Sequence, residues 1–158
     1  MLTWREFAAQ QPDLAEAGRG LLYQFGVGLA FLATTRADGA PRVHPMCPLV
    51  TEDGLYAFIV PSPKRNDLHR DGRYAMHSFP ADDNEDAFSL AGQAEQVTDP
   101  ELAATLAIRY ADEREMREPP EALATWEPFE FRIESCLLTR TTKHGDADPQ
   151  HTAWHSPT

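Results

Sequence analysis

The sequence has few basic residues and few cysteines, and each scarcity excludes a class of protein. It has 14 lysines and arginines against 25 aspartates and glutamates, which gives a formal net charge of −11. A charge of this sign repels phosphate backbones and anionic lipid, so we expect no general binding to nucleic acid or membranes. Cys47 and Cys136 are the only cysteines. They are too few for a disulfide framework and lack a zinc-like spacing, which suits a reducing cytoplasm.

Long hydrophobic runs are also missing. The longest apolar stretch, around residues 29–33, is far shorter than the ~20 residues that a helix needs to cross a bilayer. Residues 1–16 contain no apolar signal core. With 158 residues, 42% of them hydrophobic, the chain is long enough for one packed domain over residues 1–158. We therefore expect a soluble, cytoplasmic protein.

Changes in hydrophobic period along the chain predict strands interrupted by a few helices. Apolar residues at helical spacing predict helices over residues 4–25. A capping residue followed by proline predicts two further helix starts, at Ser62-Pro63 and at Asp99-Pro100. Runs of β-forming residues bounded by turns predict strands at 29–36, 42–50, 55–60, 73–79, 87–97 and 129–134.

This order of elements predicts an α+β, mostly β fold. Helices are inserted between antiparallel strands rather than alternating with them, which favours a split β-barrel of about six antiparallel strands with flanking helices. The barrel covers about residues 27–144, and the tail, 145–158, has one short strand around 152–154. Pro45 and Pro48 lack the N–H that a central strand donates, so the second strand should be an edge, bulged or open to a ligand.

The helix that starts at Ser62 carries its charges in an unusual order. Ser62 is a good N-cap and Pro63 a good first residue, yet Lys64 and Arg65 put two cations at the positive end of the helix dipole. In one interpretation Lys64 pairs with Asp67 one turn later and Arg65 points to solvent. In the other, the unpaired N–H groups of the first turn and the two cations bind a phosphate.

Four segments around this helix start occur in an informative order. They are TTRADGAPRVHPM, DGLYAFIV, SPKRNDLHRDGRYAMHSF and FSLAGQAEQVTDPE. The order resembles the pyridoxamine 5'-phosphate oxidase-like superfamily, the FMN-binding split β-barrels, over roughly residues 27–134. The resemblance implies an FMN-dependent oxidoreductase that acts on a small molecule. It also implies a homodimer whose cofactor site lies at the subunit interface.

The resemblance further implies which residues contact the cofactor. Ser62 and Lys64 would bind the FMN phosphate, and Arg65 is a nearby candidate because of its charge. The ribityl chain and the isoalloxazine would be lined by His44, Pro45, Met46, Phe58 and Ile59. The hydride or electron transfer belongs to the flavin ring, so no catalytic residue is implied.

The chain departs from the family pattern at three positions where better-known members carry basic residues: His44, Leu49 and Pro63. Each missing charge-assisted bond forfeits on the order of 1.5 to 3 kcal/mol, which predicts weaker FMN binding. The segment TRTTKHGDAD does not reproduce the cluster that holds the substrate phosphate in the true oxidases, so we do not expect pyridoxamine phosphate as substrate. Two further hypotheses stay open. One is a deazaflavin-dependent reductase of the same fold, and the other is a non-catalytic flavin or haem binder with His44 or a tail histidine as axial ligand.

Histidines and tryptophans supply the remaining candidates. His151 and His155 are four residues apart, but no carboxylate or cysteine completes a metal site, so we expect none. We interpret His77 as a hydrogen-bonded interior residue. Trp126 and Trp154 could stack on a flat ring or pack at a dimer interface.

Overall fold

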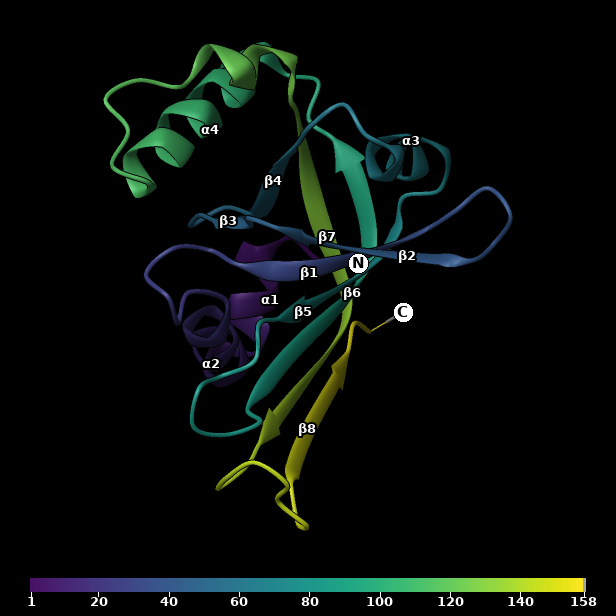
Figure 1. Cartoon of the computed structure of the whole chain (residues 1–158), viewed down its shortest axis with the longest axis vertical. Helices are drawn as coiled ribbons and strands as arrows, with labels where there is room; N and C mark the ends of the chain where they lie inside the picture. Colours follow the sequence, from purple (N-terminus) through teal and green to yellow (C-terminus); the bar gives the residue numbers. More distant parts are fainter. Residues whose placement is uncertain (158) are drawn as a thin grey trace.

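A single curled sheet of eight strands organises the chain in the computed structural model, which describes residues 1–157 (Figure 1). All of its pairings are antiparallel, in the order β2-β1-β5-β6-β7-β4-β3, and β8 pairs with β7. The mostly β, split-barrel prediction is confirmed, although the sheet has eight strands rather than about six. The strands are β1 (Ala30–Thr35), β2 (Pro41–Met46), β3 (Leu49–Val50), β4 (Leu55–Ile59), β5 (Arg73–Ser78), β6 (Ala87–Gln96), β7 (Glu127–Arg140) and β8 (Gln150–His155).

The strand predicted over 42–50 is two strands, separated at Cys47 and Pro48. Pro48 cannot donate a ladder hydrogen bond, so the pairing of β2 with β1 ends before it. Within residues 1–157, β2 pairs with β1 alone, which confirms the edge position predicted from its prolines. The predicted tail strand is β8, and it extends the sheet beyond β7.

The helices predicted over residues 4–25 are two. They are α1 (Trp4–Gln10) and α2 (Pro12–Leu22), and the chain turns at Gln11 because Pro12 starts a new helix. The other helices are α3 (Pro63–Arg70), α4 (Pro100–Glu113) and the 3-10 helix η1 (Glu121–Thr125). Asp99 accepts bonds from the backbone N–H groups of Glu101 and Leu102, as its capping role predicts. None of the helices within the described residues has the length and apolar character needed to cross a membrane.

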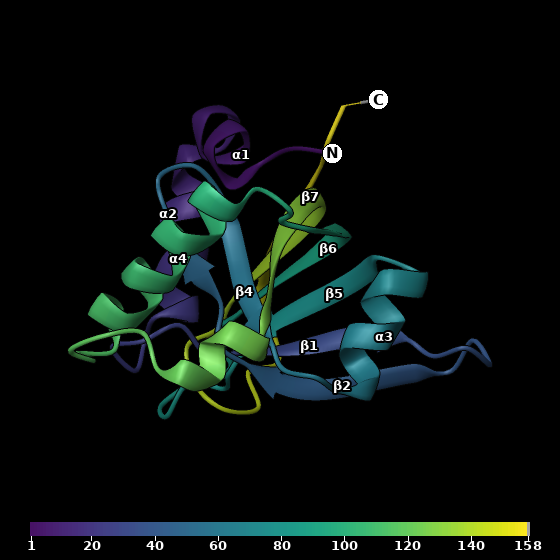
Figure 2. The same cartoon turned by 90° about the horizontal axis from the view of Figure 1, so that it is seen from above.

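Two hydrophobic clusters stabilise the fold. The main core fills the inside of the curled sheet under α1, α2 and α3, and its largest fully buried side chains include Phe7, Phe88, Phe129 and Phe131. A smaller set, called here the α4 cluster, joins α4 and η1 to β3 and β4. Its buried members are Leu49, Tyr56, Leu106, Tyr110 and Leu123. Both views place α3 and α4 on either side of β7 (Figures 1 and 2).

The other face of the sheet is open in the single chain. This outer face comprises Pro41, Val43, Pro45, Phe31, Ala33, Thr35, Arg73, Ala75 and His77, which are exposed or half-buried. Val43 is 59% exposed and lies beside Ala33 in the register. The interior position expected for His77 is wrong, because strand alternation places its side chain on this outer face, opposite Phe31.

Candidate functional site

The start of α3 has no side-chain cap. Ser62 has the extended backbone of an N-cap, but its Oγ donates to the carbonyl oxygen of Val60 at 2.8 Å and does not bond to a helical N–H. Pro63 occupies the first helical position, as predicted. The first turn therefore presents the positive end of the helix dipole without a carboxylate to neutralise it.

The interpretation in which Lys64 pairs with Asp67 and Arg65 points to solvent is wrong in both of its parts. Asp67 does not pair with Lys64, because its buried carboxylate bonds to Arg42 at 2.7 Å and to Arg70 at 3.1 Å. Arg65 does not point to solvent. Its side chain is 19% exposed, donates to the carbonyl oxygen of Thr125 at 3.0 Å and lies 3.5 Å from a carboxylate oxygen of Glu127.

Lys64 is left as a half-buried cation without an ion pair among residues 1–157. Burial lowers the pKa of its ammonium group, and the nearby thiol of Cys47 offsets part of this effect. A buried charge that lacks a partner is unfavourable, and an anion beside it would restore the lost stabilisation. Lys64 and the uncapped first turn therefore form a candidate anion site at one corner of the barrel.

Sequence reasoning missed two residues near this corner. Cys47 lies in the break between β2 and β3 and is close enough to Lys64 and Tyr110 for its charge to affect the pKa of each. Tyr110 belongs to α4 and contacts Phe58 edge-on, with ring centroids 5.4 Å apart, and Trp126 at 6.4 Å. Pro48 was the signal in the sequence that could have predicted a break in the strand at Cys47. Nothing local brings α4 to this position.

The strand residues predicted to line the cofactor have different environments. The side chains of Met46 and Ile59 are buried in the main core, whereas Phe58 packs against the α4 cluster. His44 is half-buried opposite Leu32, and Pro45 is exposed on the outer face. The structure of one chain thus places Ser62 and Lys64 at the helix start and Phe58 beside the α4 cluster. His44 and Pro45 lie along the edge strand.

The two tryptophans also differ. Trp126 packs in the α4 cluster, while Trp154 packs against Phe7 of the main core at a centroid distance of 5.1 Å. Arg65 contacts Thr125 and Glu127, the two chain neighbours of Trp126, so Trp126 is the tryptophan near the helix start.

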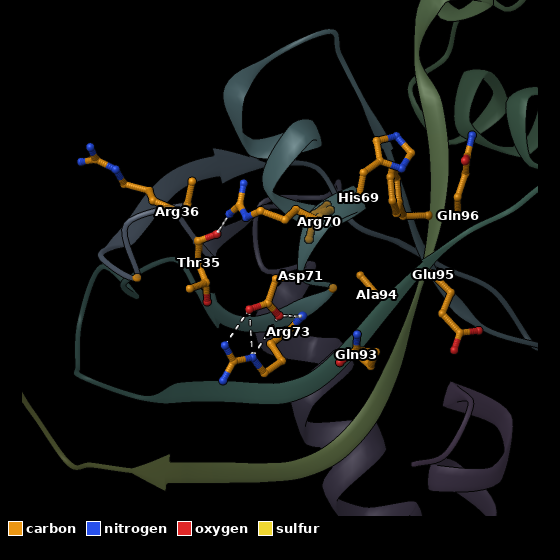
Figure 3. A pocket seen from close by; sticks show the side chains of 15 residues that line it. Thr35, Arg36, His69, Arg70, Asp71, Arg73, Gln93, Ala94, Glu95 and Gln96 are labelled. Atoms are coloured by element: carbon orange, nitrogen blue, oxygen red, sulfur yellow. Dashed lines mark hydrogen bonds and ion pairs between the residues drawn. The ribbon is translucent and has the colours of Figure 1, made fainter.

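A cavity of about 760 Å³ opens at the opposite end of α3 (Figure 3). Three arginines line it, yet each already has an acidic partner: Arg36 pairs with Asp38, Arg70 with Asp67 and Arg73 with Asp71. None of the sequence-predicted cofactor residues lines this cavity. It offers a polar surface but little unpaired positive charge.

Comparison with known proteins identifies the family. The family model described as pyridoxamine 5'-phosphate oxidase matches residues 25–133, which is more than half of the chain. The chain belongs to this family. The matched region begins shortly after α2, ends within β7 and includes the start of α3. A comparison with curated proteins finds no match.

Solved structures with the same fold have varied names. An F420 reductase is 23% identical with a TM-score of 0.57, over 68% of this chain and 87% of that one. A haem-binding protein from Mycobacterium smegmatis is 16% identical with a TM-score of 0.64, over 88% of this chain and 57% of that one. A Clostridium acetobutylicum protein related to general stress protein 26 is 15% identical with a TM-score of 0.60, over 96% of this chain and 95% of that one. At these identities the similarity shows the fold alone.

Proposed function

We propose that the protein is an FMN-dependent oxidoreductase that acts on a small molecule as a homodimer. The observation that carries the proposal is the half-buried Lys64 at the uncapped start of α3, which has no ion pair within the described part of the chain. A phosphate carries negative charge and several acceptor oxygens, so it would satisfy both the ammonium group and the helix dipole. Membership of the pyridoxamine 5'-phosphate oxidase family supports the same cofactor.

Each proposed site residue has a distinct task. Lys64 would bind the phosphate, and the hydroxyl of Ser62 would bind it after releasing the carbonyl of Val60. Arg65 would act at longer range, because Thr125 and Glu127 already hold its guanidinium group.

The strand residues would orient the rest of the cofactor and exclude water. Phe58 would contribute an aromatic ring beside Tyr110. On β2, His44 would contribute the edge of its imidazole ring and Pro45 an apolar surface. Met46 and Ile59 would contribute through their backbone, since their side chains lie in the main core. When bound, FMN supplies the hydride or electron transfer at its ring.

We expect a large loss of FMN affinity when Lys64 is replaced by glutamate. The change removes one charge-assisted bond and adds repulsion, so the affinity should fall at least about 100-fold. Lys143→Glu is the matched control, because Lys143 is exposed in the loop before β8 and should leave affinity unchanged. Fluorescence titration with FMN measures both variants. Equal affinities of Lys64→Glu and the parent protein would refute the assignment.

The open outer face supports a dimer. Exposed apolar side chains on the edge of a sheet favour contact with a second copy that buries them. We expect Val43→Glu to shift the protein to a monomer in light scattering, because a charge on this face would be buried in the dimer. Ile108→Glu is the matched control, since Ile108 on α4 is 54% exposed and lies away from the outer face. A parent protein that is monomeric at micromolar concentration would contradict the shared site.

A deazaflavin is the second candidate cofactor, and the similarity in fold to an F420 reductase supports it. Its phosphate would use the same Lys64. Haem is the third candidate, with His44 as axial ligand. The absorbance spectrum of freshly purified protein distinguishes these cofactors, because a flavin, a deazaflavin and a haem absorb at different wavelengths. A Soret band would overturn the FMN proposal.

A further inference from the structure

Another cavity, which is basic, lies among α1, α2, α4 and the turn between β3 and β4. Its volume is about 600 Å³, and Arg5, Arg19 and Arg109 line it. The cavity shares no lining residue with the start of α3. Figure 2 places α1, α2 and α4 together on the side of the molecule opposite α3.

Two of these arginines have no carboxylate partner in the part of the chain that the structure describes. Within residues 1–157, every arginine has a carboxylate oxygen within 4.0 Å except Arg19, Arg109 and Arg117. In an acidic chain with net charge −11, carboxylates are abundant, so unpaired guanidinium groups are uncommon here. That two of the three line one cavity indicates that the cavity concentrates positive charge.

Arg19 is held in place without a carboxylate. Its guanidinium carbon lies 4.9 Å from the centre of the Tyr23 ring. The hydroxyl of Tyr23 in turn accepts the backbone N–H of Val50 at 2.9 Å, which ties the ring to β3. A cation stacked on a fixed ring keeps its hydrogen-bond donors free and loses little entropy when it binds a ligand.

Apart from Thr51 and Glu52, the rest of the lining is apolar. Trp4 is buried and, with Val50, supplies an apolar wall, and Glu52 is the one acidic side chain of the lining. Arg5 is paired with Asp53 and contributes less than the other two arginines. The cavity thus combines a net positive charge with an aromatic wall.

We propose that this cavity binds a small organic anion, with its carboxylate or phosphate held by Arg19 and Arg109 and its apolar body against Trp4. A carboxylate or phosphate matches the planar fork of a guanidinium group, and two such groups at one cavity favour an anion over a neutral ligand. An aromatic or aliphatic body would bury its surface against the indole ring. The site is independent of the cofactor proposal, because none of its residues belongs to the α3 start.

The test titrates the full chain with benzoate and, separately, with phenyl phosphate. The indole N–H signal of Trp4, assigned by Trp4→Phe, reports binding in ¹⁵N NMR spectra. All titrations use the Lys64→Glu background, so that a phosphate bound at α3 does not contribute. We expect a saturable shift with at least one anion and none with benzyl alcohol, which is a neutral ligand of similar shape.

Matched arginine variants decide the assignment. Arg19→Gln and Arg109→Gln should each weaken binding about tenfold, whereas Arg117→Gln, which removes the third unpaired arginine, should not change it. All three side chains are exposed, so the variants should keep the unfolding midpoint of the parent. Should Arg19→Gln fold poorly, Arg109→Gln still tests the site. The proposal fails if neither anion gives a saturable shift, or if all three variants bind alike. Saturation by only one of the two anions supports the site and assigns the head group.

Discussion

Replacing Gly92 with alanine should lower the free energy of unfolding by about 3 kcal/mol. A Cβ atom at this position would lie 1.9 Å from the backbone carbonyl oxygen of Arg132, on the neighbouring strand. Overpacking a core typically costs about 1 to 3 kcal/mol, and a clash with backbone lies at the upper end because a main-chain atom cannot rotate away. The strands would have to separate at the irregularity between Ala91 and Gly92, where the β6–β7 register shifts.

This irregularity matters for the whole sheet. β7 pairs with β6 along most of its length, while its first part also pairs with β4 and its last part with β8. A bulge increases the local twist, which lets β7 pair with β4 at its start and with β8 at its end in a curled sheet. Loss of the close approach at Gly92 would therefore weaken the connection between the two halves.

Gly20→Ala is the matched control for this prediction. Nothing lies within 4 Å of a Cβ at Gly20, which is an exposed position in the last turn of α2. Alanine there should raise the free energy of unfolding by about 0.5 to 1 kcal/mol, because it reduces the entropy of the unfolded chain. Urea denaturation compares the two variants with the parent. A Gly92→Ala midpoint equal to that of the parent would refute the backbone contact.

Local signals predicted the helix starts and most strand positions. Ser62-Pro63 and Asp99-Pro100 each combine a capping residue with a first-turn proline, and both begin helices in the structure. The full length of β7 was not predictable in the same way. The alternation of apolar and polar residues in its sequence ends after Glu134. Residues 135–140 are held in the strand by pairing with β6 and β8. Tertiary pairing, not local pattern, decides the end of this strand.

In the candidate site, too, local sequence predicted some features and tertiary contacts decided the others. The two cations beside the helix dipole are a local anomaly, so the sequence identified Lys64 as a candidate anion ligand. Which carboxylate each cation meets depends on distant segments: Arg65 pairs with Glu127, and Asp67 pairs with Arg42. Sequence distance alone could not assign these pairs. It also could not show that Arg65 pairs with Glu127 while Lys64 has no ion pair within residues 1–157.

Asp67→Asn should also destabilise the fold strongly, by about 3 kcal/mol or more at pH 7. The side chain of Asp67 is 4% exposed and accepts hydrogen bonds from Arg42, Thr34 and Arg70. These bonds join α3 to β1 and β2. Removing one partner of a buried ion pair leaves the other charge uncompensated, which typically costs about 3 to 5 kcal/mol.

The pH dependence of this loss identifies its cause. Burial alone would raise the pKa of Asp67, but the hydrogen bonds from Arg42, Thr34 and Arg70 outweigh it and hold the pKa below the ordinary value of 3.8. A lowered folded-state pKa stabilises the protein above pH 3.8, and this stabilisation is lost as the pH falls through the folded-state pKa. The difference between the parent and Asp67→Asn should therefore be full at pH 7 and shrink as the pH falls below 3.8.

A matched exposed carboxylate separates the buried ion pair from general charge effects. Glu95 is 60% exposed and lies 3.5 Å from Arg132, so Glu95→Gln should change the free energy of unfolding by less than about 1 kcal/mol. Urea denaturation of both variants between pH 3 and pH 7 measures the two effects. Similar losses in the two variants, or a loss for Asp67→Asn that does not vary with pH, would contradict a charged Asp67 as the link between α3 and the edge of the sheet. Because α3 also presents Lys64, a loosened helix in Asp67→Asn should weaken FMN binding even though Asp67 itself is not a proposed ligand.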